Sequence, residues 1–133
     1  MKSVIDLNWL PKSKDGGNKR GHWGSHVTSV RNVQFEGYIE GLTVLGGSLA
    51  PAQHSFPEGD LVLTIDAWQA GRRVMDGDNL LSAMKPFVDG LEAAEVFTSD
   101  RQIKRWVVNL HRAPSEKHVR MRVTLEPLVE PLI

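Results

Sequence analysis

Two aspartates flank a glycine at the start of a helical pattern, in the stretch DGDNLLSAMKPFVDGL (76–91). Residues two apart in an extended segment project to the same side, so we expect Asp76 and Asp78 to direct both carboxylates at one point. Close carboxylates repel each other unless a cation lies between them, and Mg²⁺ prefers such oxygen ligands. The alternative is structural: Asp78 caps the helix, while Asp76 interacts with the helix dipole.

The composition narrows the choice of metal. The chain has no cysteine, so a thiolate metal site and a disulfide framework are both excluded. A metal held only by oxygen or imidazole ligands is typically a hard cation such as Mg²⁺ or Mn²⁺.

These residues lie in a chain of 133 residues that is 41% apolar, which predicts one folded domain spanning 1–133. Apolar patterning predicts a strand over 3–10, a helix over 25–45, a strand over 60–69 and a helix over 80–91. Segments 102–112 and 119–127, joined by a turn at 113–118, are predicted to form a two-stranded unit. The expected fold class is α+β (mixed α/β), with a mixed sheet of about four strands, two main helices and the order β-α-β-α-β-β.

The net charge is zero, but the charges are unevenly distributed. Basic residues dominate the N-terminal part and the C-terminal third, and acidic residues dominate the middle. This pattern fits a basic surface around an acidic pocket, and it fits equally well two solvated strand faces. We find no signal peptide at the start of the sequence and no apolar span long enough for a bilayer, so the cytoplasm is the expected location.

The stretch DGDNLLSAMKPFVDGLEAAEVFTSDRQI (76–103) resembles the central motif of the RusA-like Holliday-junction resolvases, a family that includes many phage proteins. The family pattern is D-x-D-N, a lysine, an aspartate–small–leucine four residues later, and an acidic pair before a strand. By this resemblance Asp76, Asp78 and Asp100 bind the metal, and Lys85 is the essential lysine. Two features depart from the pattern: the spacing between Asn79 and Lys85 is longer, and Ser99 replaces the first residue of the acidic pair.

The resemblance implies a homodimeric, Mg²⁺-dependent endonuclease, with Mn²⁺ as a substitute ion, that cuts four-way DNA junctions with one strand cleaved per subunit. Such an enzyme serves recombination and repair or phage DNA processing in a bacterial or phage-infected cell. The residues expected to contact DNA are Arg72, Arg73, Asn79, Lys19, Arg20 and His22. Asn79 is equally well explained as a helix-start residue, and His22 as a partner of Trp23.

Two alternatives stay open. One is a noncatalytic DNA-binding protein of the RusA-like fold, which the Ser99 departure permits. The other is a metal enzyme acting on small phosphorylated molecules, although no phosphate-binding loop supports it. For Asp89, an ion pair with Lys85 across one helix turn is preferred to a role in a second metal site.

Overall fold

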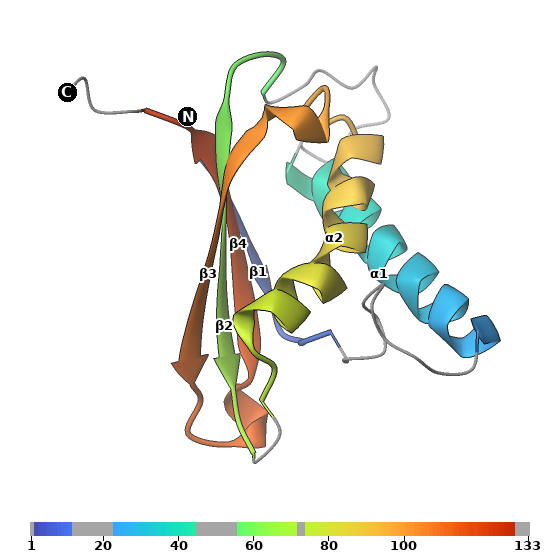
Figure 1. Ribbon diagram of the computed structural model, residues 1–133, viewed down its shortest axis with the longest axis vertical. Helices are drawn as coiled ribbons and strands as arrows, with labels where there is room; N and C mark the ends of the chain where they lie inside the picture. The colour runs from blue at the N-terminus through green and yellow to red at the C-terminus, as the bar shows by residue number, and fades with distance from the viewer. Residues whose placement is uncertain (1, 12–22, 45–55, 72–73, 130–133) are drawn as a thin grey trace.

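The computed structural model describes residues 2–11, 23–44, 56–71 and 74–129, with only the backbone described at 23–30 and 44 (Figure 1). The main elements are β1 (Ser3–Leu7), α1 (Trp23–Val44), β2 (Leu61–Gln69), α2 (Gly77–Ala93), β3 (Ile103–Arg112) and β4 (Arg120–Pro127). Short 3-10 helices, η2 (Asp100–Gln102) and η3 (Glu116–His118), precede β3 and β4. The predicted fold class and the predicted element order are confirmed.

The four strands form one mixed sheet in the order β1-β4-β2-β3. Strand β2 pairs in parallel with β3 and antiparallel with β4, so Ile65 has Val108 on one side and Val123 on the other. Since β2 separates β3 from β4, the prediction that 102–112 and 119–127 form a two-stranded unit is wrong. Helix α2 returns the chain to the end of the sheet where β2 began, so β3 runs parallel to β2. The connection through η3 then takes the chain past β2, and β4 pairs with β2 on its other side.

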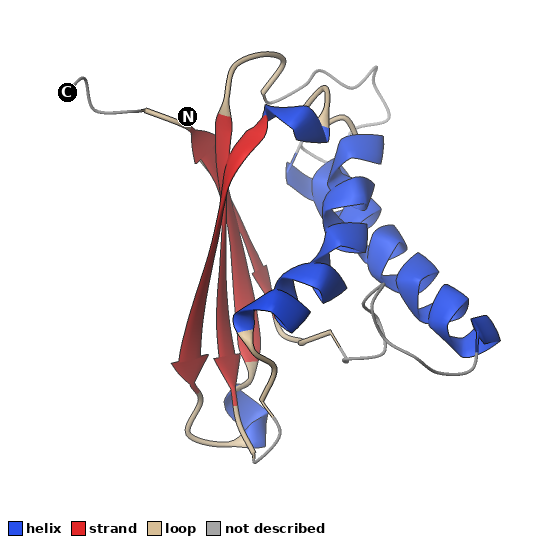
Figure 2. Cartoon of the chain, in the orientation of Figure 1, coloured by secondary structure: helices blue, strands red, loops and turns tan. Residues whose placement is uncertain are grey.

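Both helices cover the same face of the sheet and leave the other face open (Figures 1 and 2). Alternation along the strands explains this, because Leu63 and Ile65 of β2 are buried while Thr64 and Asp66, which alternate with them, face the open side. Helix α2 contributes an apolar stripe to the same core, made up of Leu80, Met84, Phe87, Val88 and Leu91. Removing this apolar surface from water is the main source of stability for the two layers.

The two helices approach each other closely through glycines. A Cβ atom added at Gly37 would lie 2.0 Å from the carbonyl oxygen of Phe87, and one added at Gly90 would lie 2.1 Å from that of Gln34. The helix backbones are therefore in direct contact at this crossing, which fixes the position of α2 above the sheet. Within the described residues, no helix is long and apolar enough to cross a membrane.

Candidate functional site

The start of α2 is held in place by a buried glutamine at the end of β2. The side chain of Gln69 accepts the backbone N–H of Met75 at 2.8 Å and donates to the carbonyl of Met75 at 3.0 Å. Asp76 is then the N-cap of α2, and its Oδ1 atom accepts the N–H of Asn79 at 2.9 Å. The prediction that Asp78 caps the helix is therefore wrong, because Asp76 is the cap and Asp78 lies in the first turn.

Asp100 lies beyond the other end of α2, in a tightly bonded turn. The Oγ atom of Ser99 accepts the N–H of Arg101 at 3.2 Å, and Oε1 of Gln102 accepts the N–H of Ser99 at 3.0 Å. The Nε2 atom of Gln102 also donates to the carbonyls of Phe56 and Gly59, at 3.2 and 3.1 Å. Ser99, the departure from the family pattern, therefore has a structural role as the cap of η2.

Three carboxylates gather at this end of α2: Asp89, Glu92 and Asp100, hereafter the Asp89 cluster. One oxygen from each lies within 4.8 Å of the others. Glu92 also accepts the backbone N–H of Asp100 at 2.8 Å, which links η2 to the last turn of α2. In the octahedral shell of Mg²⁺, with metal–oxygen distances of about 2.1 Å, oxygens on opposite sides lie about 4.2 Å apart and adjacent oxygens about 3.0 Å. Side-chain rotations would have to bring the three oxygens closer together by about 1–2 Å for them to share one ion.

The structure does not bring Asp76 and Asp78 to this cluster. They lie at the N-terminal end of α2, while Glu92 lies in its last turn. With a rise of 1.5 Å per residue, the two ends are separated by about 20 Å. The three carboxylates predicted to form one metal cradle, Asp76, Asp78 and Asp100, are thus not assembled within one chain.

Two of the predicted catalytic residues do meet. Lys85 and Asp100 line one pocket of about 390 Å³, together with Leu81, Val88, Asp89 and Trp106. The pocket lies between α2 and the edge strand β3. Within the described residues no ion pair joins Lys85 to Asp89, so the preferred pairing of these two side chains is not formed. Lys85 instead lines the pocket that also contains Asp89 and Asp100.

The electrostatics of the pocket favour a cation beside the carboxylates. Burial raises the pKa of Asp89 above its ordinary value of 3.8, the negative charges of Asp100 and Glu92 raise it further, and Lys85 acts in the opposite direction. Asp89 is an exposed residue, so water screens these interactions. Burial is the largest of these causes, and Lys85 acts on the pKa of Asp89 less strongly than Asp100 or Glu92 does. A divalent ion beside the cluster would act in the same direction as Lys85.

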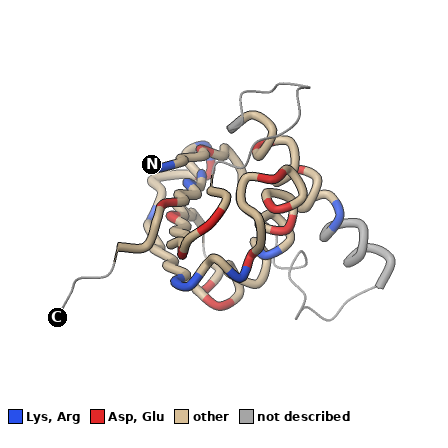
Figure 3. Tube along the Cα trace, turned by 90° about the horizontal axis from the view of Figure 1, so that it is seen from above, with Lys and Arg blue, Asp and Glu red and all other residues tan. Residues whose placement is uncertain are grey.

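Acidic residues outnumber basic residues on the helices, and the reverse holds on strands β3 and β4 (Figure 3). The helices carry five acidic and two basic residues: Glu36, Glu40, Asp78, Asp89 and Glu92, against Arg31 and Lys85. Strands β3 and β4 carry five basic residues and one acidic residue: Lys104, Arg105, Arg112, Arg120 and Arg122, against Glu126. The acidic pocket therefore borders a basic strand, an arrangement that fits both interpretations of the charge pattern.

Trp68 lies on the open face of the sheet, but its ring is covered and is not free to stack on a DNA base. The ring of Trp68 stacks on His111 of β3, with centroids 4.7 Å apart and an interplanar angle of 17°. On the side of β4, the guanidinium carbon of Arg120 lies 4.1 Å from the ring centroid. Neighbours on both flanking strands thus cover the indole, which makes Trp68 part of a cross-strand ladder.

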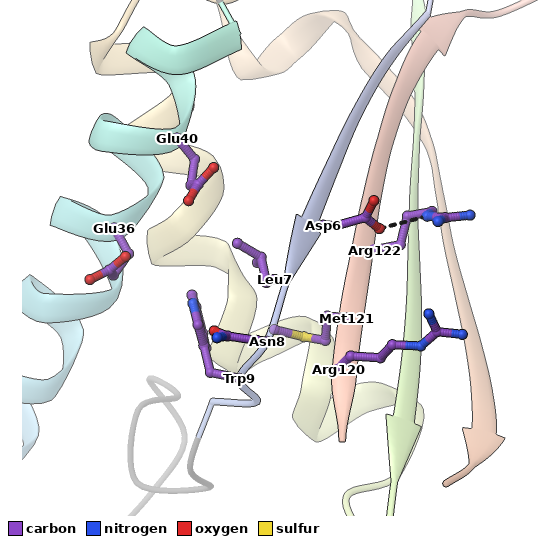
Figure 4. A pocket seen from close by; sticks show the side chains of 9 residues that line it. All are labelled: Asp6, Leu7, Asn8, Trp9, Glu36, Glu40, Arg120, Met121 and Arg122. Carbon is purple, nitrogen blue, oxygen red and sulfur yellow. Dashed lines mark hydrogen bonds and ion pairs between the residues drawn. The ribbon is translucent and has the colours of Figure 1, made fainter. Parts of the chain in front are cut away.

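A larger, open pocket of about 730 Å³ lies beside β1 and α1 (Figure 4). Glu40 extends from α1 towards Leu7, and Glu36 lies one turn earlier on the same helix, while Arg122 on the other face of the sheet bonds Asp6 at 2.7 Å. Burial, and then the charge of Glu36, raises the pKa of Glu40 above its ordinary value of 4.5. None of the residues predicted from the sequence to act in catalysis lines this pocket.

Five of the residues predicted to contact DNA, Arg72, Arg73, Lys19, Arg20 and His22, lie outside the described residues. Asn79 is exposed in the first turn of α2, away from the Asp89 cluster. The sequence patterns did not identify Glu92, and they predicted that Asp89 forms an ion pair with Lys85 instead of binding a metal. The signal was present, because Asp89 and Glu92 are three residues apart on a helix and so lie on one face.

No protein-family model matches the chain, and a comparison with curated proteins finds no match to it either.

Proposed function

We propose that this protein is a Mg²⁺-dependent endonuclease that cleaves branched DNA, with four-way junctions as its substrate. The observation that carries the proposal is the meeting of Lys85, Asp89 and Asp100 in one pocket, with Glu92 completing a cluster of three carboxylates. Phosphodiester hydrolysis requires an activated water and neutralisation of the charge that builds up on the phosphoryl oxygens. The residues of the pocket are suited to both requirements.

Asp89, Glu92 and Asp100 would hold Mg²⁺, or Mn²⁺ in its place, since all three offer the hard oxygen ligands that these ions prefer. When bound, such an ion supplies a water of lowered pKa and polarises the phosphate. Lys85 is placed to contact the scissile phosphate, because its side chain lines the same pocket as Asp89 and Asp100. Lys104 and Arg105, exposed on β3 close after Asp100, are suited to holding the adjoining DNA backbone.

We also propose that the protein acts as a homodimer, which would give Asp76 and Asp78 a catalytic role. Asp78 and Asp89 are both exposed on α2, at opposite ends of the helix. If two copies pair about a two-fold axis with their α2 helices antiparallel, the N-terminal aspartates of one copy approach the Asp89 cluster of the other. A divalent ion would then join carboxylates that otherwise repel. The two ions would serve the two strands to be cut, in a bacterial or phage-infected cytoplasm where such DNA is found.

The test is cleavage of a synthetic four-way junction, a linear duplex and single-stranded DNA, each with and without Mg²⁺. We expect the junction to be cut only with Mg²⁺ or Mn²⁺, and we expect Asp100→Asn to abolish cleavage while junction binding persists. Asp6→Asn is the matched control, because it removes an exposed carboxylate outside the site, whose ion pair among the described residues is with Arg122.

Two results would count against this function. Equal cleavage by the wild type and Asp100→Asn would reject the assignment of the site. Salt-sensitive junction binding without cleavage in either metal would favour the alternative, a noncatalytic DNA-binding protein of the same fold.

A further inference from the structure

The pocket that contains Lys85 has two chemically different halves. Lys85, Asp89 and Asp100 form the charged half. Leu81 and Val88 of α2, with Trp106 of β3, form the apolar half. Trp106 is only partly buried: it packs against the hydrophobic core and also lines the pocket. The metal and phosphate chemistry proposed above uses the charged half alone. In the apolar half Val88 belongs to the buried core, and the partly buried Leu81 and Trp106 pack against that core and still line the pocket.

The size and composition of the pocket suit a single nucleotide. Its volume of about 390 Å³ is within the range of about 300–1,000 Å³ that is common for small-molecule sites. A nucleotide has the same two-part character, with an apolar, flat base joined to a charged phosphate. Of the tryptophans whose surroundings are described, Trp68 is covered by His111 and Arg120, and Trp9 packs edge-on against Phe87 with ring centroids 6.1 Å apart. Trp106 alone among these three lies in the pocket with the catalytic candidates.

We infer that the apolar half, Leu81, Val88 and Trp106, is a base-binding subsite that takes one unstacked nucleobase next to the phosphate to be cleaved. This inference rests on the proposed nuclease function and adds the feature of the substrate that is recognised, a base free of its stack. Removing a base from an intact duplex costs a few kcal/mol, and we expect this cost to be lower at a branch point, where the duplex is interrupted. The subsite thus gives a physical reason for selecting branched over linear DNA.

In this subsite Trp106 would contact the substrate through the face of its indole ring. Stacking on an aromatic side chain tolerates any base, because every base has a π-face. The subsite is therefore expected to act without sequence preference of its own. Phenylalanine at this position would retain most of the interaction, whereas leucine would retain the apolar contact with the core and lose the stacking.

The experiment uses the full chain and a four-way junction with 2-aminopurine at the branch point, whose fluorescence reports on unstacking. Ca²⁺ replaces Mg²⁺, and strand integrity is checked on a denaturing gel. Trp106→Leu is expected to weaken junction binding by about 5- to 100-fold and to change the fluorescence response on binding, while Trp106→Phe stays within a few-fold of the wild type. Trp68→Leu, on the other face of the sheet, is the matched control and should bind as the wild type does. Thermal unfolding of each variant separates loss of fold from loss of contact.

If folded Trp106→Leu binds the junction and changes its fluorescence as the wild type does, the subsite is rejected, and wild-type cleavage in Mg²⁺ leaves the proposed function standing. An equal loss in Trp68→Leu would also reject the subsite, because the effect would then not belong to the pocket. If the wild type neither binds nor cuts any of the DNAs, the proposed function fails and the subsite fails with it.

Discussion

Oε1 of Glu92 accepts the backbone N–H of Asp100 at 2.8 Å, and this bond joins the last turn of α2 to the turn that leads into β3. The same glutamate belongs to the Asp89 cluster, so one side chain both positions Asp100 and offers an oxygen to a cation. A hydrogen bond to a carboxylate is stronger than one between neutral groups. Glu92 therefore couples the shape of the site to its charge.

Substitutions at Glu92 should separate these two roles. Glu92→Gln keeps an acceptor oxygen for the Asp100 N–H but removes the charge, so we expect its stability to fall by less than about 1 kcal/mol and its Mn²⁺ affinity to fall about tenfold or more. Glu92→Ala removes both features and should also destabilise the fold, by about 1–2 kcal/mol. Calorimetric Mn²⁺ titration and urea unfolding measure the two effects. Unchanged Mn²⁺ binding in both variants would show that Glu92 is no ligand.

The turn around Asp100 depends on Gln102 in a comparable way. Its side chain accepts the N–H groups of Thr98 and Ser99 and donates to two carbonyls in the segment before β2. Gln102→Ala should destabilise the protein by about 1–3 kcal/mol and slow junction cleavage, because Asp100 loses its support. Gln102→Glu, which retains the two accepted bonds, should lie between the wild type and the alanine variant in both measurements. An alanine variant with normal stability would rule out this positioning role.

The faces of the elements could be predicted from the sequence, because alternation is a local property. Leu63 and Ile65 point to the core, as the period of two requires, and the apolar stripe of α2 is buried as its spacing indicates. Neighbour order within the sheet is not local. Strands 102–112 and 119–127 look like a hairpin because a short polar segment joins them, yet β2 lies between them. Nothing in their own patterns reports this insertion.

The candidate site was predictable to a similar extent. Lys85 and Asp100 were selected by the family pattern, and they share a pocket. The separation of Asp76 from Asp100 follows from topology: β2 and β3 run parallel, so α2 must carry the chain from one end of the sheet to the other. Residues that precede and follow such a helix lie at opposite ends, whatever the motif suggests. The Asp89 cluster depends on the bond from Asp100 to Glu92, which no sequence pattern reveals.

Glu40 should contribute a loss of stability as the pH rises above about 4.5. Its pKa in the folded protein is raised above the ordinary value of 4.5, so the folded state binds this proton more tightly than the unfolded state does. The contribution is most favourable below pH 4.5 and is lost as the pH rises through the raised pKa. Glu36→Gln should reduce the loss, but should not remove it, because burial is the larger cause. Urea unfolding between pH 4 and pH 8 measures the slope, with Glu58→Gln as an exposed control.

The contact between α1 and α2 should be intolerant of even one methyl group. At position 90, a Cβ would lie 2.1 Å from the carbonyl oxygen of Gln34 and 2.6 Å from the backbone nitrogen of Tyr38. Since both are backbone atoms, Gly90→Ala has to separate the helices and should cost about 1–3 kcal/mol or more. Gly77→Ala is the matched control, because the nearest described atom to its Cβ would be in Val108, at 4.0 Å, and alanine favours a helix by up to about 1 kcal/mol. Equal unfolding temperatures for the two variants would contradict the close approach.

Mixing two inactive variants tests whether the two ends of α2 act together across a dimer. Asp78→Asn and Asp100→Asn should each abolish Mg²⁺-dependent cleavage, because in a homodimer of either variant both sites lack one carboxylate. In a mixed dimer, one site lacks both carboxylates and the other keeps Asp78 from one copy and Asp100 from the other. Mixing equal amounts should therefore restore about a quarter of the wild-type activity, since half of the dimers are mixed and each has one intact site.

A mixture of Asp89→Asn with Asp100→Asn is the control and should stay inactive, because both substitutions affect the same cluster. If Asp78→Asn alone cuts as well as the wild type, the site is complete within one chain. If both variants are inactive and their mixture is too, although mixed dimers form, Asp78 does not act across the interface.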